Sequence, residues 1–159
     1  MNNKPTYPVI IVDDATGYLD LIESEDGLTT STALGLARNV YKNFCAFDQN
    51  GFRWRVHNIE SDYKMNGLTK ILAYTFYNPK VKVKLHWAME SSYQMADLIS
   101  DIKKQVDRDD DILTQFEEGE IIKEKIQRAN TFDELVGTLN KCMFKVNEQE
   151  LWKEEESIK

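Results

Sequence analysis

The strongest constraint on the fold is the strict alternation of side chains over residues 80–87. One face carries Val81, Val83, Leu85 and Trp87, and the other carries three lysines and His86. A period of two is typical of a strand with one buried and one solvated face, and it excludes a helix here. Lysines on such a strand would also suit a position at a sheet edge, where they discourage unwanted pairing.

A hairpin is predicted upstream, where residues 39–48 and 52–59 flank Gln49-Asn50-Gly51. Asn and Gly both tolerate positive φ, so the dipeptide Asn50-Gly51 suits a tight turn. On the second strand we expect a buried face of Phe52, Trp54 and Val56 and a wet face of Arg53, Arg55 and His57. On the first strand, Cys45 and Phe47 should face away from Phe44 and Ala46.

Two further strands are predicted at residues 8–12 and 18–22, separated by a turn. The segments 25–38 and 65–77 stay open between helix and strand. Within the second segment, helical spacing is present at Leu68, Ile71, Leu72 and Phe76. Asn78-Pro79 must end any helix there.

The pattern becomes helical after Trp87. Ser91 and Gln94 have the spacing of a capping box, and an amphipathic stripe follows at Met95, Leu98, Ile99, Ile102 and Val106. A short helix is expected around residues 121–126. A second capping box, from Thr131 to Glu134, opens another helix.

Strands followed by helices predict an α+β fold. We expect a mainly antiparallel sheet from the N-terminal half, with a C-terminal helical layer packed on one face. The 159 residues suit a single domain, 1–159. It divides into a strand-rich part (1–90), a helix-rich part (91–147) and a charged tail (148–159).

The net charge of −7 is unevenly distributed. Residues 1–90 hold ten basic and ten acidic side chains, whereas residues 91–159 hold ten basic and seventeen acidic ones. A nucleic-acid partner is not expected, because phosphate contacts need a basic surface. The excess either forms a partner-binding surface or serves solubility as a solvated helical layer.

No apolar run approaches the length of a membrane span, so no membrane partner is expected. Cys45 and Cys142 are far apart in sequence and form no CxxC pair. We interpret them as two reduced, buried thiols, which favours a cytoplasmic location.

The densest acidic run is Asp107-Arg108-Asp109-Asp110-Asp111, with Glu118 further on. Its acidic residues match the ligand spacing of a calcium-binding loop, but Ile112 stands where the sharp turn requires Gly. We therefore expect no metal or other cofactor here, and interpret these aspartates as caps of a segment starting at Ile112.

The two histidines, His57 and His86, fall on the wet faces of predicted strands. Pairing of those strands would bring them together, with Glu60 or Glu90 nearby. This arrangement supports the alternative hypothesis of a small metal-dependent enzyme or ligand-binding domain.

Several segments carry a resemblance to a known group of proteins. They are Asp109–Phe116, Ile126–Ala129, Thr131–Leu135, and the hairpin Phe47–Gly51 with Trp54. Together they resemble small bacterial proteins regarded as immunity proteins of polymorphic or contact-dependent toxins. The resemblance implies a non-enzymatic protein that neutralises a toxin by binding it.

An acidic surface would be steered towards a basic toxin. The residues expected to bind such a partner are Asp107, Asp109, Asp110, Asp111, Glu117 and Glu118.

Overall fold

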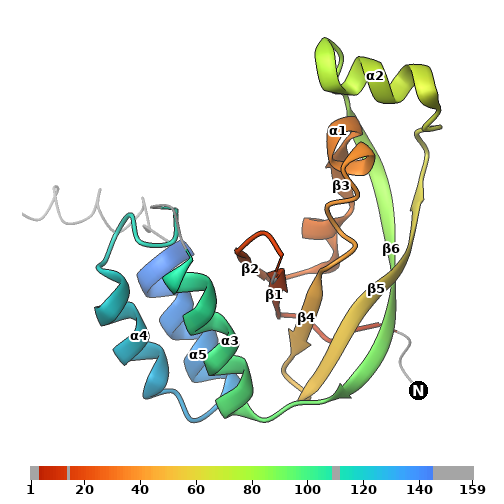
Figure 1. Cartoon of the computed structure of the whole chain (residues 1–159). Helices are drawn as coiled ribbons and strands as arrows, with labels where there is room; N and C mark the ends of the chain where they lie inside the picture. Colours follow the sequence, from red (N-terminus) through yellow and green to blue (C-terminus); the bar gives the residue numbers. More distant parts are fainter. Residues whose placement is uncertain (1–3, 14, 109–111, 145–159) are drawn as a thin grey trace, which may run out of the picture.

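A computed structural model describes residues 4–13, 15–108 and 112–144. Its six strands form one antiparallel sheet in the order β2-β1-β4-β5-β6-β3 (Figure 1). The strands are β1 (Val9–Asp13), β2 (Tyr18–Ile22), β3 (Thr30–Thr32), β4 (Cys45–Asp48), β5 (Phe52–Ser61) and β6 (Lys80–Ser92). The α-helices are α1 (Ala33–Ala37), α2 (Gly67–Thr75), α3 (Met95–Asp107), α4 (Gly119–Gln127) and α5 (Phe132–Leu139). A 3-10 turn, η1 (Glu25–Leu28), and a π-helical turn, η2 (Asn140–Phe144), complete the described elements.

Strand β1 is buried on both faces, which explains its continuous apolar sequence. Ile10 and Val12 pack against the helical layer, together with Cys45 and Phe47 of β4. Val9 and Ile11 face a second core that also contains aromatic side chains from other strands. The prediction that Cys45 and Phe47 share one face of the sheet is therefore confirmed.

Helices α3, α4 and α5 cover one face at the β2-β1-β4 end of the sheet (Figure 1). The predicted stripe on α3 provides Leu98, Ile99, Ile102 and Val106, all of them buried. The mixed α+β architecture with an antiparallel sheet and a helical layer on one face is thus confirmed.

Strands β5 and β6 form a long hairpin that rises away from the helical layer, with α2 across its tip (Figure 1). The register shifts between Arg53 and Trp54 and again between Val56 and Asn58. Such irregularities bend a strand pair and increase its twist. One prediction for β5 is wrong: Phe52, the first residue of the strand, is 37% exposed, whereas Trp54 and Val56 are buried as expected.

A buried carboxylate, Asp48, ties the start of this hairpin together. The residue is 1% exposed. Its Oδ1 accepts hydrogen bonds from the backbone N–H groups of Asn50 and Phe52, both at 3.0 Å. Its Oδ2 accepts from Nε1 of Trp54 at 2.8 Å and from the backbone N–H of Thr6 at 3.2 Å. Four donors therefore compensate the cost of burying this charge.

The backbone carbonyl of Asp48 extends this network to the junction between β6 and α3. It accepts a hydrogen bond from the hydroxyl of Tyr93 at 2.7 Å. Burial, reinforced by the Asp48 carboxylate, raises the pKa of Tyr93 above its ordinary value. The hydroxyl therefore stays protonated at neutral pH and remains a donor.

One predicted strand boundary is wrong. The strand expected from residue 39 begins at Cys45, because Asn39 adopts a positive φ of 55° and ends the α1 segment instead. In the hairpin turn only Gly51, with φ of 81°, has positive φ. Asn50 does not need it, because its N–H is held by the Asp48 side chain.

The predicted helix starts are partly wrong. Ser91 and Ser92 still belong to β6, and Gln94 precedes α3 without a side-chain cap. Thr131 does accept from the N–H of Glu134, but the Glu134 carboxylate returns to the N–H of Asn130, one residue before the cap.

The sequence also predicts that aspartates cap a segment starting at Ile112. Asp109, Asp110 and Asp111 lie outside the described residues. Residues 112–118 form turns and bends, and the next helix starts at Gly119.

The sequence left residues 25–38 and 65–77 open between helix and strand, and the structure assigns both segments. Residues 25–38 form η1, β3 and α1, and residues 67–75 form α2.

We predict that Asp48→Asn lowers the free energy of unfolding by about 3 kcal/mol, because an amide cannot accept all four hydrogen bonds of the carboxylate. Trp54→Phe removes one of these bonds and should cost about 1–2 kcal/mol. Chemical denaturation measures both values. The same exchange at exposed Asp26 is the control and should stay within about 0.5 kcal/mol of the wild type. A loss at Asp48 no larger than at Asp26 would contradict this role.

Candidate functional site

The predicted acidic binding residues are largely engaged in ion pairs where the structure describes them. Asp107 lies 2.6 Å from Nζ of Lys123, which also contacts Glu120 at 2.6 Å. Glu117 pairs with Lys125. Glu118 lies at the N-terminus of α4, where a carboxylate interacts favourably with the helix dipole.

The described part of the helical layer is nearly neutral. Residues 95–108 hold three acidic and three basic side chains, and residues 112–144 hold six and four. Most of the acidic excess therefore lies in residues 109–111 and 145–159, which include Asp109, Asp110 and Asp111 and are outside the described structure. The described helices alone do not form a strongly acidic face.

Glu117 is the most enclosed carboxylate of this group, with its side chain 22% exposed. The hydrogen bond from Lys125, followed by one from the Cys142 thiol, lowers the pKa of Glu117. Burial and the same carboxylate raise the pKa of Cys142. Cys142 and Cys45 are both buried and free, as the sequence indicates. A protonated, buried thiol is a poor nucleophile, so Cys142 serves packing here.

The structure brings the two histidines together. Asn58 pairs with His86 across the β5–β6 ladder, and the irregularity at residue 57 places the His57 ring 6.1 Å from the His86 ring. Oε1 of Glu60 lies 3.0 Å from Nε2 of His86. The other expected carboxylate, Glu90, instead pairs with Arg53 and Arg55.

The surroundings of this histidine pair do not favour a metal cation. A hollow of about 330 Å³ beside the two rings is also lined by Lys4, Glu25 and Lys84, and Lys4 pairs with Glu25. The positive charge of Lys84 would repel a bound cation. Among the described residues, no group of three or more His, Cys, Asp or Glu side chains is arranged to hold a metal ion.

An exposed apolar surface occupies the tip of the β5–β6 hairpin. We call residues 63–80 the apex. Its exposed large apolar side chains are Met65, Leu68, Ile71, Tyr74, Phe76 and Tyr77. Phe76 is 91% exposed, Leu68 66% and Ile71 63%. The helical spacing seen in the sequence is therefore real, but this face of α2 points to solvent.

The apex is held rigidly despite its exposure. Asn66 and Thr69 form a reciprocal capping box that fixes the start of α2. Ala73 is buried beneath the helix. Below it, the first turn of α1 bonds to the chain leaving α2: the N–H of Leu34 donates to Oδ1 of Asn78 at 2.8 Å.

Basic side chains surround the apex. The apex itself contains Lys64, Lys70 and Lys80 and no acidic residue, and Asp62, just before it, accepts a hydrogen bond from the backbone N–H of Lys82. Arg38 of the α1 segment stacks over the Tyr74 ring, with its guanidinium carbon 5.7 Å from the ring centroid. The apex thus combines an apolar surface with a positive rim.

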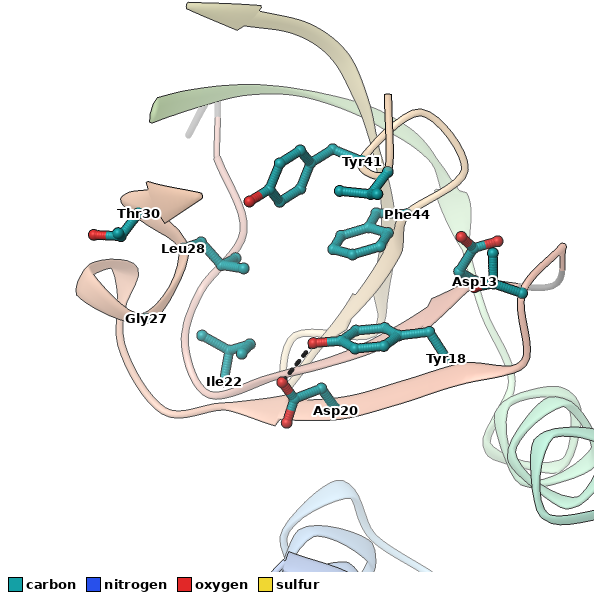
Figure 2. Close-up of a pocket in the computed structure, with 11 residues that line it drawn as sticks. Asp13, Tyr18, Asp20, Ile22, Gly27, Leu28, Thr30, Tyr41 and Phe44 are labelled. Atoms are coloured by element: carbon teal, nitrogen blue, oxygen red, sulfur yellow. Dashed lines mark hydrogen bonds between the residues drawn. The ribbon is translucent and has the colours of Figure 1, made fainter. Parts of the chain in front are cut away.

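An aromatic pocket lies between the β1–β2 hairpin, the η1–β3 segment and the loop before β4 (Figure 2). Its volume is about 460 Å³. Tyr18 and Phe44 stack with their centroids 5.2 Å apart, and Tyr41 meets Phe44 edge to face at the same distance. Ile22 and Leu28 extend this apolar wall (Figure 2).

The described polar side chains that line this pocket are two carboxylates and four hydroxyl groups, with no cationic group among them. Asp13 is 2% exposed, and its Oδ1 accepts from the N–H of Ala15 at 2.8 Å. The Tyr18 hydroxyl donates to Oδ2 of Asp20 at 2.7 Å (Figure 2). Burial and then this hydrogen bond raise the pKa of Tyr18, so its phenol stays neutral.

Comparison with known proteins adds no assignment: no family model, no curated protein and no solved structure matches this chain. Within the described part of the chain, the helices are too short or too polar to cross a bilayer.

Sequence reasoning missed both the apex and the aromatic pocket as sites. The apex had a signal, since a stretch of lysines without acidic residues overlaps a helical apolar stripe. The pocket had none, because Tyr18 comes from β2 whereas Tyr41 and Phe44 come from the loop before β4, and these two segments meet only in the folded chain.

The contribution of the Glu117–Lys125 ion pair to stability should depend on pH. Glu117→Gln should lower the thermal midpoint at pH 7, because it removes the charge that Lys125 stabilises. A depressed pKa means that this contribution is present above the ordinary carboxyl value of about 4.3 and is lost as the pH falls through the folded-state value.

The difference from the wild type should therefore shrink between about pH 5 and pH 3 in thermal unfolding scans. Glu124→Gln is the control, since Glu124 makes only a long, exposed contact with Arg128. A difference at Glu117 that stays constant down to pH 3 would exclude this electrostatic origin.

Proposed function

We propose that this chain is a protein-interaction module that binds an acidic protein partner through the apex. The observation that carries the proposal is the concentration of exposed apolar side chains: six of the thirteen large ones in the described structure lie within residues 65–77. Isolated exposed apolar residues are ordinary, but a contiguous group of them marks an interaction surface.

The composition of the apex supports a protein partner. Tyr, Phe, Met and Arg are enriched in protein interfaces, and the apex presents the first three beside Arg38. The apolar side chains come from α2 and both of its flanks, which gives a broader surface than the stripe of a membrane-surface helix. The cap and the buried Ala73 keep this surface preorganised, which lowers the entropic cost of binding.

The charge of the apex defines the partner. Residues 63–80 hold three lysines, Lys64, Lys70 and Lys80, and no carboxylate, so the apex would repel a basic surface and attract an acidic one. We infer that the partner presents an apolar groove bordered by carboxylates.

An immunity-type inhibitor that binds a basic toxin is the second candidate. The net charge of −7 and the resemblance to immunity proteins support it. Its contact residues would be Glu118 and the aspartates 109–111, since Asp107 and Glu117 already pair with α4 lysines. A basic partner bound on this side of the molecule would favour the inhibitor, and an acidic partner at the apex would favour the first proposal.

A cytoplasmic location belongs to the same proposal. The two free, buried thiols support it, because reduced cysteines are usual in that compartment.

Crosslinking tests the apex directly. A photoreactive residue replaces Phe76 in one variant and Glu124, on the exposed side of α4, in the control variant. We expect a crosslinked protein specific to position 76, and that protein, once purified, should bind less tightly as the salt concentration rises. Identical products from both positions, or binding only to vesicles of anionic phospholipid, would contradict the proposal.

With the purified partner, Ile71→Ser should weaken binding by about tenfold or more, because it removes an anchor from the centre of the apex. Ile121→Ser is the matched control, an exposed isoleucine on α4, and should leave the affinity unchanged. Neither variant should shift the free energy of unfolding by more than about 0.5 kcal/mol, since both side chains are exposed. Equal affinities for the two variants would exclude the apex as the contact surface.

A further inference from the structure

We propose that the aromatic pocket of Figure 2 binds a small organic cation, namely a primary ammonium or guanidinium group attached to an apolar body. This site is separate from the apex and does not depend on the function proposed for it. Its volume of about 460 Å³ lies in the range of pockets that enclose small ligands.

The charges of the residues that line the pocket favour a positively charged ligand. The eleven described residues that line the pocket include Asp13 and Asp20 and no lysine, arginine or histidine. An anion would meet two carboxylates without a compensating cation. A cation would instead gain a charge-assisted hydrogen bond, which is stronger than a neutral one.

The hydrogen-bonding groups of the pocket favour a ligand that donates hydrogen bonds. The Tyr18 hydroxyl already donates its proton to Asp20, so its oxygen is oriented to accept from a ligand. The hydroxyl groups of Thr30 and Tyr41 also line the pocket and can accept. Ammonium and guanidinium groups have donors only, and they therefore match this set.

The aromatic walls select an apolar body. Tyr18, Phe44 and Tyr41 provide ring surfaces with negative faces, which attract cations as well as apolar groups. Tyr41 and Phe44 are both 7% exposed, so these walls are fixed by packing within the second core. Tyr18 is 39% exposed and lies at the mouth, next to Asp20.

The two carboxylates of the pocket, Asp13 and Asp20, have different surroundings. Asp13 is buried at one end of the pocket and also stabilises the turn through Ala15. Asp20 is held at the mouth by Tyr18 and is half-buried. We infer that Asp20 pairs with the ligand cation, while Asp13 contributes to the negative potential of the pocket.

Two ligands of the same shape and opposite charge test the proposal: phenethylamine and 3-phenylpropionate. In thermal unfolding scans, phenethylamine at ten times its dissociation constant should raise the midpoint by about 3–6 °C. 3-Phenylpropionate should cause no shift. Binding measured by calorimetry should be weakened about fivefold to tenfold in Asp20→Asn and unchanged in Asp26→Asn, the same exchange at a nearby residue outside the pocket.

NMR locates the site independently of the variants. Phenethylamine should shift the ring protons of Tyr18, Tyr41 and Phe44 more than those of Phe76. Tyr18→Phe, which keeps the ring and loses the hydroxyl, provides a second variant if Asp20→Asn alters the fold. The proposal is overturned if phenethylamine does not bind, if both ligands bind equally, or if the shifted signals lie outside the pocket.

Discussion

The Asp48 carboxylate is the constraint on which the rest of the structure depends. It lies where the N-terminal segment, the β4–β5 turn and the start of α3 approach one another, and every one of these contacts is a hydrogen bond to its side chain or carbonyl. A buried charge is tolerated only when its acceptors are occupied. The hydrogen bond from Tyr93 to the backbone carbonyl of Asp48 joins this turn to the start of the helical layer, which packs on the sheet through a shared apolar core.

The candidate sites follow from that arrangement. The β5–β6 hairpin starts at the Asp48 turn and carries the apex to its far end, away from the helices (Figure 1). The same sheet curls so that its second core, opposite the helical layer, contains Tyr41 and Phe44. The aromatic pocket opens at the margin of this core. The same sheet thus carries two surfaces that differ in charge: a basic, apolar apex and an acidic, aromatic pocket.

Sequence patterns predicted what depends on local periodicity. The alternation at Lys80–Trp87 and the α3 stripe identified the strand, the helix and the buried faces correctly. They did not predict the exposure of Phe52, which is the first residue of β5 and is covered less than Trp54 and Val56 further along the strand. The limit to local periodicity also applies to the sites. The adjacency of His57 and His86 was a stated hypothesis, whereas the pocket around Tyr18 depends on contacts between distant segments.

Hydrogen exchange tests the central claim about Asp48 most directly. The backbone amides of Asn50 and Phe52 lie in or beside a surface turn, where amides normally exchange quickly. Because both donate to a buried carboxylate, they should exchange at least about a hundredfold more slowly than in an unstructured peptide, and Asp48→Asn should remove most of that protection. Exchange of both amides at the unstructured rate in the wild-type protein would contradict the account.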